Sequence, residues 1–126
     1  MPAVDKEIDG VREGVCAGTS LEDVRAYLAR FPEVHFYKGC FPESAGTFAD
    51  SPARFCFVHL DVDIYESTKD GLEYFYPRMN RGGIILSHDY CSIGLAGVKR
   101  GFDEFMKDKP EPVIELWDSQ ALLVKA

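Results

Sequence analysis

The stretch Leu60-Asp61-Val62-Asp63-Ile64-Tyr65-Glu66-Ser67-Thr68 links an apolar run to a helical pattern. The run before it, Phe55 to Leu60, is nearly unbroken in apolar residues, which is typical of a strand covered on both faces. After it, a helix is predicted from about Ser67, because apolar residues recur at helical spacing: Leu72, Phe75, Tyr76 and Met79. The stretch therefore predicts the turn between a buried strand and a helix, with aspartates at the end of the strand.

A second strand and a second helix follow in the same order. Ile84-Ile85-Leu86 predicts a buried strand that ends at Ser87-His88-Asp89-Tyr90, and Asn80-Arg81-Gly82-Gly83 predicts a turn before it. The next helix is predicted from the apolar stripe Val98, Phe102, Phe105 and Met106, with Pro110 and Pro112 after its end. Residues 113–116 and 121–124 then predict a closing antiparallel hairpin.

The N-terminal part of the chain is less regular. Residues 1–19 are polar and have no clear period, so we expect them to be partly irregular. Ser20 and Asp23 form a pattern similar to a capping box, which predicts a helix that Pro32 ends. Val34 to Tyr37 predicts a short strand. Together with the later alternation of strands and helices, this order predicts an α/β fold with a mainly parallel sheet and a single domain over residues 1–126.

Composition excludes several classes of protein. The chain is 46% hydrophobic and 28% charged, as in soluble globular proteins. A net charge of −7 argues against nucleic-acid binding, which depends on clustered Lys and Arg. No apolar run approaches the ~20 residues that span a membrane, and no signal peptide is recognisable. The chain has four cysteines: Cys16, Cys40, Cys56 and Cys91. They form no CxxC pair, so we expect reduced thiols and a cytoplasmic protein.

Both buried strands end in groups that can bind a metal ion. Asp61 and Asp63 follow the first strand, and His88 and Asp89 follow the second. Ligands of open parallel sheets bind beyond the carboxyl ends of the strands, so these groups converge if the strands are neighbours. Carboxylates favour magnesium, calcium or manganese, whereas an imidazole favours manganese, iron or zinc. An aspartate at a strand end often only caps the following helix, and that interpretation also stays open.

Two segments resemble the macrocin O-methyltransferase family, whose members methylate sugar hydroxyls of natural products such as macrolides and aminocoumarins. Phe57 to Thr68 is similar to the family pattern Leu-Asp-x-Asp-x-Tyr-Glu-Ser/Thr-Thr. Gly82 to Tyr90 is similar to a second family pattern, in which Gly-Gly precedes a hydrophobic strand and an acidic pair before Tyr. Three shorter pieces also fit: Gly39-Cys40-Phe41-Pro42-Glu43, Gly97-Val98-Lys99-Arg100 and residues 110–116. The resemblance covers residues 20–125.

The resemblance implies a truncated Rossmann-like sheet of the class I methyltransferases, with S-adenosylmethionine and Mg2+ or another divalent metal as cofactors. It places Asp61 at the first metal ligand, and His88 and Asp89 at a second ligand pair that is usually Asp-Asp. His88 either ligates through nitrogen, changes the metal preference, or leaves coordination to the aspartates. Asp63 and His88 are then the catalytic candidates for taking the proton of a small-molecule hydroxyl. Tyr65 and Tyr90 are candidates for lining the substrate pocket.

The cofactor-binding part of the family fold is not recognisable. The resemblance implies a strand running into a glycine-rich turn, but Gly10, Gly14 and Gly18 follow no buried strand. We therefore expect residues 20–126 to correspond to the C-terminal portion of the fold, and we expect no ordinary methyl transfer by a lone monomer. The strand at Val34 to Tyr37 would pair with the Phe57 strand or with another subunit, and an exposed central strand edge predicts a homodimer or larger assembly.

Two alternatives to a methyltransferase remain open from the sequence. Haloacid dehalogenase-like phosphatases also end a buried strand in Asp-x-Asp, and there Asp61 would be the nucleophile and Asp63 the acid and base. Those proteins usually carry Thr or Val where this chain has Tyr65. The other alternative is a truncated methyltransferase relic that binds a metal or a partner and catalyses nothing.

Overall fold

The computed structural model describes residues 3–8, 14, 17–48 and 52–126. Its elements, in chain order, are α1 (Ala3–Ile8), α2 (Leu21–Tyr27), η1 (Glu43–Phe48), β1 (Phe55–Leu60), α3 (Tyr65–Phe75), η2 (Tyr76–Arg78), β2 (Met79–Ser87), α4 (Ala96–Met106), β3 (Ile114–Glu115) and β4 (Ala121–Val124). The predicted α/β class is confirmed, and α3 begins two residues before the predicted start at Ser67. None of the described helices is long and apolar enough to cross a membrane.

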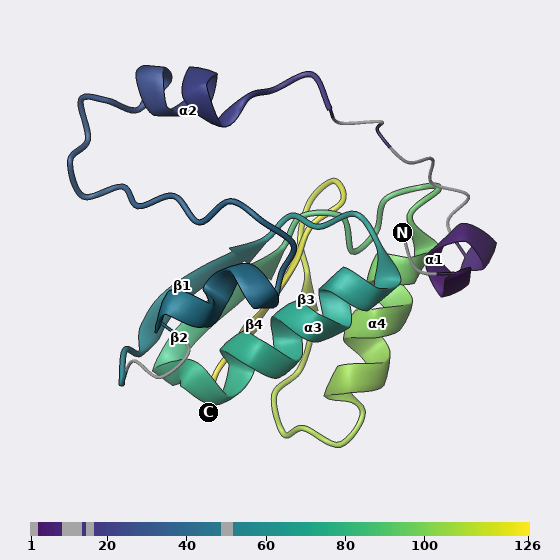
Figure 1. The fold of residues 1–126 in the computed structure, drawn as a ribbon. Coiled ribbons are helices and arrows are strands. Elements are labelled where there is room, and N and C mark those ends of the chain that lie inside the picture. Colours follow the sequence, from purple (N-terminus) through teal and green to yellow (C-terminus); the bar gives the residue numbers. More distant parts are fainter. Residues whose placement is uncertain (1–2, 9–13, 15–16, 49–51) are drawn as a thin grey trace.

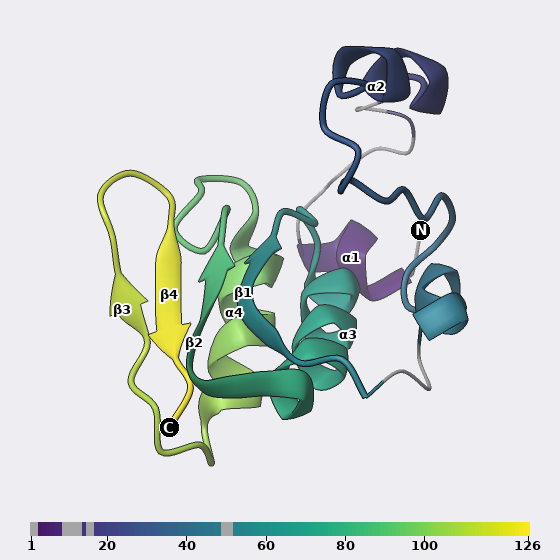
Figure 2. The ribbon, with the colours of Figure 1, turned by 90° about the vertical axis from the view of Figure 1, so that its left-hand side faces the viewer.

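The strands form one mixed sheet with the order β1-β2-β4-β3 (Figure 2). β1 and β2 are parallel neighbours, with Leu60 opposite Ser87, and α3 makes the crossover between them. β4 pairs antiparallel with both β2 and β3, which confirms the predicted C-terminal hairpin. The connection through a helix is what a parallel pair requires, because a short turn cannot bring two strands into the same direction.

Helices α3 and α4 cover the same face of the sheet, as Figures 1 and 2 show. On that face the cross-strand row Val58–Ile85–Leu123 is buried, together with Phe102 and Leu72 of the helices. Two glycines permit the close approach, since a Cβ on Gly71 would lie 3.0 Å from Leu60 and one on Gly101 would lie 3.1 Å from the Tyr65 carbonyl oxygen.

The opposite face of the sheet has no helix over it among the described residues. Its cross-strand row Phe57–Ile84–Val124 leaves Phe57 54% exposed and Val124 42% exposed. The prediction that the Phe55 to Leu60 strand is covered on both faces was therefore wrong, and Cys56 is exposed as well. A run of apolar residues indicates suitability for burial on two faces but does not supply the second cover.

Residues 80–83 lie inside β2 and not in a turn before it, which corrects the sequence prediction. The pairing moves from Phe55 opposite Met79 to Phe57 opposite Ile84, so the extra residues of β2 form a bulge. Gly82 makes this possible with a φ of +78°, and its amide donates to the Lys125 carbonyl oxygen at 2.7 Å. The predicted turn was wrong because the same glycines suit a bulge, through which the strand continues.

The segment around α2 extends away from the sheet and its helices (Figure 1). Its predicted cap is present, because the Ser20 hydroxyl oxygen accepts from the Asp23 amide at 3.0 Å. Val34 to Tyr37 is not a strand of the sheet, and β1 pairs with no strand other than β2 among the described residues. Residues 9–13 and Cys16 lie outside the described residues, while Cys40, Cys56 and Cys91 are free thiols.

The C-terminal end of the chain is attached through buried Glu111. Its carboxylate accepts from the Tyr76 hydroxyl at 2.6 Å, the Lys125 ammonium at 2.8 Å and the Ala126 amide at 3.0 Å. Burial alone would raise the pKa of Glu111, but these hydrogen bonds outweigh it and lower the pKa to about 2. The carboxylate thus joins η2, the segment after α4 and the chain beyond β4.

We predict that Glu111→Gln lowers the free energy of unfolding at pH 7 by on the order of 2–3 kcal/mol. Because the pKa is lowered in the folded state from its ordinary 4.5 to about 2, the stabilisation is complete above pH 4.5 and is lost as the pH falls toward 2. Urea unfolding of both proteins across this range should show the difference shrinking on acidification. The control is Glu33→Gln at an exposed position, which should change neither the free energy of unfolding at pH 7 nor its dependence on pH. If the difference between wild type and Glu111→Gln stays constant across the pH range, the prediction is contradicted.

Candidate metal and acceptor site

The parallel pairing of β1 and β2 brings their carboxyl ends to one edge of the sheet. The pairing continues one residue beyond the strands, because the His88 amide donates to the Leu60 carbonyl oxygen at 2.9 Å. Asp61 is therefore the first residue after β1, His88 is the first residue after β2, and Asp89 follows His88. One ligand atom from each of these three side chains lies within 4.8 Å of the others. The predicted convergence of the two strand ends is thus present in the fold.

The three side chains differ in their exposure. Asp61 is exposed, the His88 side chain is 42% exposed, and Asp89 is only 8% exposed. His88 Nε2 lies 4.0 Å from Asp89 Oδ1, which is at the limit of a direct ion pair. These groups therefore lie near one another without forming a tight ion pair.

Asp63 completes the group of acids at this edge. Its backbone has a φ of 61°, a left-handed conformation that Asp adopts more readily than most residues. Its pKa is raised, first by burial, then by a hydrogen bond with Asp89 and by the charges of Asp89 and Asp61. The left-handed backbone at Asp63, which carries conformational strain, therefore places a third carboxyl group beside Asp61 and Asp89.

Two serines that the sequence analysis did not single out brace this edge. The Ser92 hydroxyl donates to Asp89 Oδ1 at 2.7 Å, and the Ser119 hydroxyl donates to the His88 carbonyl oxygen at 2.9 Å. Ser119 also accepts at its carbonyl from the Cys91 amide at 2.8 Å, so the β3–β4 hairpin supports residues 88–91. The sequence could have predicted the hydrogen bond between Ser92 and Asp89, because a Ser three residues after an Asp often bonds to it in a turn.

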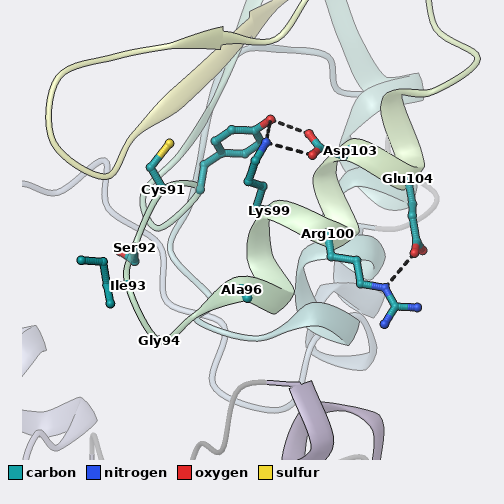
Figure 3. Close-up of a pocket in the computed structure, with 10 residues that line it drawn as sticks. Cys91, Ser92, Ile93, Gly94, Ala96, Lys99, Arg100, Asp103 and Glu104 are labelled. Carbon is teal, nitrogen blue, oxygen red and sulfur yellow. Dashed lines mark hydrogen bonds and ion pairs between the residues drawn. The ribbon is translucent and has the colours of Figure 1, made fainter.

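Tyr90 is buried and does not point a free hydroxyl at a ligand. Its hydroxyl donates to Asp103 and accepts from the Lys99 ammonium at 2.7 Å, and Lys99 also contacts Asp103 Oδ2 at 2.9 Å (Figure 3). Burial and the Asp103 hydrogen bond raise the pKa of Tyr90, so the hydroxyl stays protonated. These contacts attach the loop after β2 to α4.

A cavity of about 630 Å³ lies between this loop and α4 (Figure 3). Tyr90 lines it, together with Ser92, Ile93, Lys99, Arg100 and Glu104, among others. Tyr65 does not line it, and its hydroxyl instead donates to Glu104 at 2.6 Å between α3 and α4. Ser92 lines the cavity and also bonds to Asp89, whereas Asp61, His88 and Asp89 themselves do not line it.

The donor set and one unsatisfied atom fit a divalent metal ion. Two carboxylates and an imidazole are common metal ligands, and three protein donors leave positions for a substrate oxygen. His88 Nδ1 is buried and has no hydrogen-bond partner among the described residues. A buried polar atom without a partner calls for an explanation such as a bound ion.

The described residues offer no comparable fit for S-adenosylmethionine. β1 is followed by Asp61 and β2 by His88, and neither strand of the described sheet runs into a glycine-rich turn. We therefore assign no residue to cofactor binding.

Comparison with known proteins identifies the fold. The O-methyltransferase NovP superimposes with a TM-score of 0.81 over 100% of this chain and 53% of that chain, at 24% sequence identity. CalS11, a TDP-rhamnose 3'-O-methyltransferase, superimposes with a TM-score of 0.55 over 63% of this chain and 36% of that chain, at 22% identity. The chain therefore shares its fold with part of each of these two proteins.

Sequence comparison gives the family. The family model "Macrocin-O-methyltransferase (TylF)" matches residues 7–120, and the chain belongs to this family. It is 36% identical over 94 residues to the 8-demethyl-8-(2,3-dimethoxy-alpha-L-rhamnosyl)-tetracenomycin-C 4'-O-methyltransferase of Streptomyces olivaceus, covering 71% of this chain and 35% of the relative. It is 32% identical over 83 residues to the mycinamicin III 3''-O-methyltransferase of Micromonospora griseorubida, covering 63% of this chain and 32% of the relative. The aligned part is about a third of the length of these relatives.

The left-handed backbone at Asp63 gives a testable prediction. Asp63→Ala and Asp63→Asn both remove the charge, but only Asn tolerates this conformation well, so the Ala variant should be less stable by about 1 kcal/mol in urea unfolding. The same two substitutions at Asp70, inside α3, should give the opposite order because Ala is the better helix former. Equal stabilities of the two Asp63 variants would show that the backbone there is unstrained.

Proposed function

We propose that this chain provides the metal-binding and acceptor-activating edge of an S-adenosylmethionine-dependent O-methyltransferase that acts on a sugar or other small-molecule hydroxyl. The observation that carries the proposal is the cluster of Asp61, His88 and Asp89, formed at the ends of adjacent parallel strands. Family membership supports the reaction class, and the names of the relatives support a glycoside as acceptor.

The proposed chemistry divides between a bound ion and the protein. Asp61, His88 and Asp89 would hold a divalent ion, whose charge lowers the pKa of an acceptor hydroxyl. Asp63 is the proposed acceptor of the hydroxyl proton, since it holds a further carboxyl group beside Asp61 and Asp89 that is not one of the three proposed ligands. His88 is the second candidate for this role in the arrangement in which the two aspartates alone hold the ion. Ser92 and Ser119 keep Asp89 and His88 in place during the reaction.

The cavity between α4 and the loop after β2 is the proposed binding surface for the acceptor. Tyr90 supplies part of its wall, and charged side chains such as Lys99, Arg100 and Glu104 can hydrogen-bond to sugar hydroxyls. Tyr65 would act indirectly, by fixing Glu104 through its hydroxyl. No observation favours the phosphatase alternative, because the family match is to O-methyltransferases.

We predict that the chain binds a divalent ion at Asp61, His88 and Asp89. Isothermal titration with Mg2+ measures this directly, and a second titration with S-adenosylmethionine tests whether the chain alone holds the cofactor. Asp61→Asn should weaken binding of the metal ion by about tenfold, since it removes one of three proposed ligands, whereas Asp108→Asn on the exposed surface after α4 should not. The absence of cofactor binding at millimolar concentration would favour the non-catalytic alternative for this chain.

The open face and edge of the sheet support a proposed homodimer. β1 is an edge strand, and Phe57 on its open face is 54% exposed. Unpaired strand edges and exposed apolar faces favour association with another chain. Such an assembly would cover the face that α3 and α4 leave bare.

Sedimentation velocity should therefore show a dimer or larger species, and Phe57→Asp should shift it toward the monomer. Tyr27→Asp is the matched control, because Tyr27 is 79% exposed but lies on α2, away from the sheet. A monodisperse wild-type monomer would contradict the proposal.

A further inference from the structure

The cluster at the strand ends contains one nitrogen donor among oxygen donors. Asp61 and Asp89 offer carboxylate oxygens, and His88 offers an imidazole nitrogen within 4.8 Å of both. We propose that His88 makes this site selective for borderline first-row transition ions, from Mn2+ to Zn2+, over Mg2+. The inference rests on the metal site in the proposed function and deepens it by naming the ion class.

The preference follows from the chemistry of the donors. Mg2+ is a hard ion that binds oxygen ligands in near-ideal octahedral geometry and keeps several waters. Imidazole suits zinc, copper, iron and nickel, and the affinity of mixed nitrogen and oxygen sites rises from Mn2+ toward Cu2+. Replacing one oxygen donor by imidazole therefore strengthens binding of the transition ions relative to Mg2+.

The environment of His88 supports its role as a ligand. Its Nδ1 atom is buried and has no hydrogen-bond partner among the described residues. Its backbone is held on both sides, by donation of its amide to Leu60 and by donation of the Ser119 hydroxyl to its carbonyl. A ring attached to such a fixed backbone is presented to an ion with little reorganisation.

A second histidine offers a matched control. His59 is exposed on β1, and its ring centroid lies 5.8 Å from that of His88, yet it is not part of the cluster. If a nearby imidazole merely attracted transition ions, His59 and His88 would have similar effects. If coordination by His88 sets the selectivity, only substitutions of His88 will change it.

The test measures dissociation constants for Mn2+, Co2+ and Mg2+ by isothermal titration of the full chain, and records the visible spectrum of the Co2+ complex. Wild-type protein should bind Co2+ at least tenfold more tightly than Mg2+, with a nitrogen- and oxygen-ligand spectrum. His88→Asp should lower this ratio at least tenfold, and His59→Asp should leave it unchanged. His88→Asn provides the same comparison should the Asp variant not fold, as circular dichroism will show.

Four results would overturn the inference. The first is an unchanged ratio in the folded His88 variant, and the second is an equal loss in His59→Asp. The third is a sulfur-to-cobalt charge-transfer band, which would place the ion on an exposed thiol such as Cys91. If no divalent ion binds the wild-type chain, the metal site of the proposed function fails as well, and this outcome is distinct from binding without selectivity.

Discussion

The parallel pairing of β1 with β2 is the constraint on which the candidate site depends. Leu60 lies opposite Ser87, and the His88 amide donates to the Leu60 carbonyl oxygen. The segments that follow β1 and β2 therefore begin side by side. The donors of the cluster come from positions far apart in sequence, and a change of register by one residue would turn the strand's side chains to the other face. The β3–β4 hairpin holds the segment after β2 in place, because the Ser119 hydroxyl donates to the His88 carbonyl oxygen.

The helices that maintain this register cover one face only. Gly71 allows α3 to lie directly on β1, and Gly101 allows α4 to pack closely on α3. The other face of the sheet presents apolar rows that include Phe57 and Val124. Parallel sheets are usually covered on both faces.

Much of the fold was predictable because its signals are local. Ser20 with Asp23 marked a helix start, the apolar runs marked β1 and the core of β2, and the hairpin was read from its flanking strands. The extension of β2 through Gly82 was not predictable, since the same glycines suit a turn or a bulge. Val34 to Tyr37 has strand-like composition but is not a strand, because a strand also needs a neighbour at its edge.

For the site, the sequence by itself determined which chemical groups follow each strand: Asp61 and Asp63 after the first, His88 and Asp89 after the second. It also determined the family, through motifs whose residues are contiguous. Only the tertiary structure decided that these groups meet, that Ser92 and Ser119 brace them, and that the Tyr65 and Tyr90 hydroxyls are bound to α4. Apart from the bond between Ser92 and Asp89, these contacts join residues at least 13 positions apart in sequence, and no local pattern records their geometry.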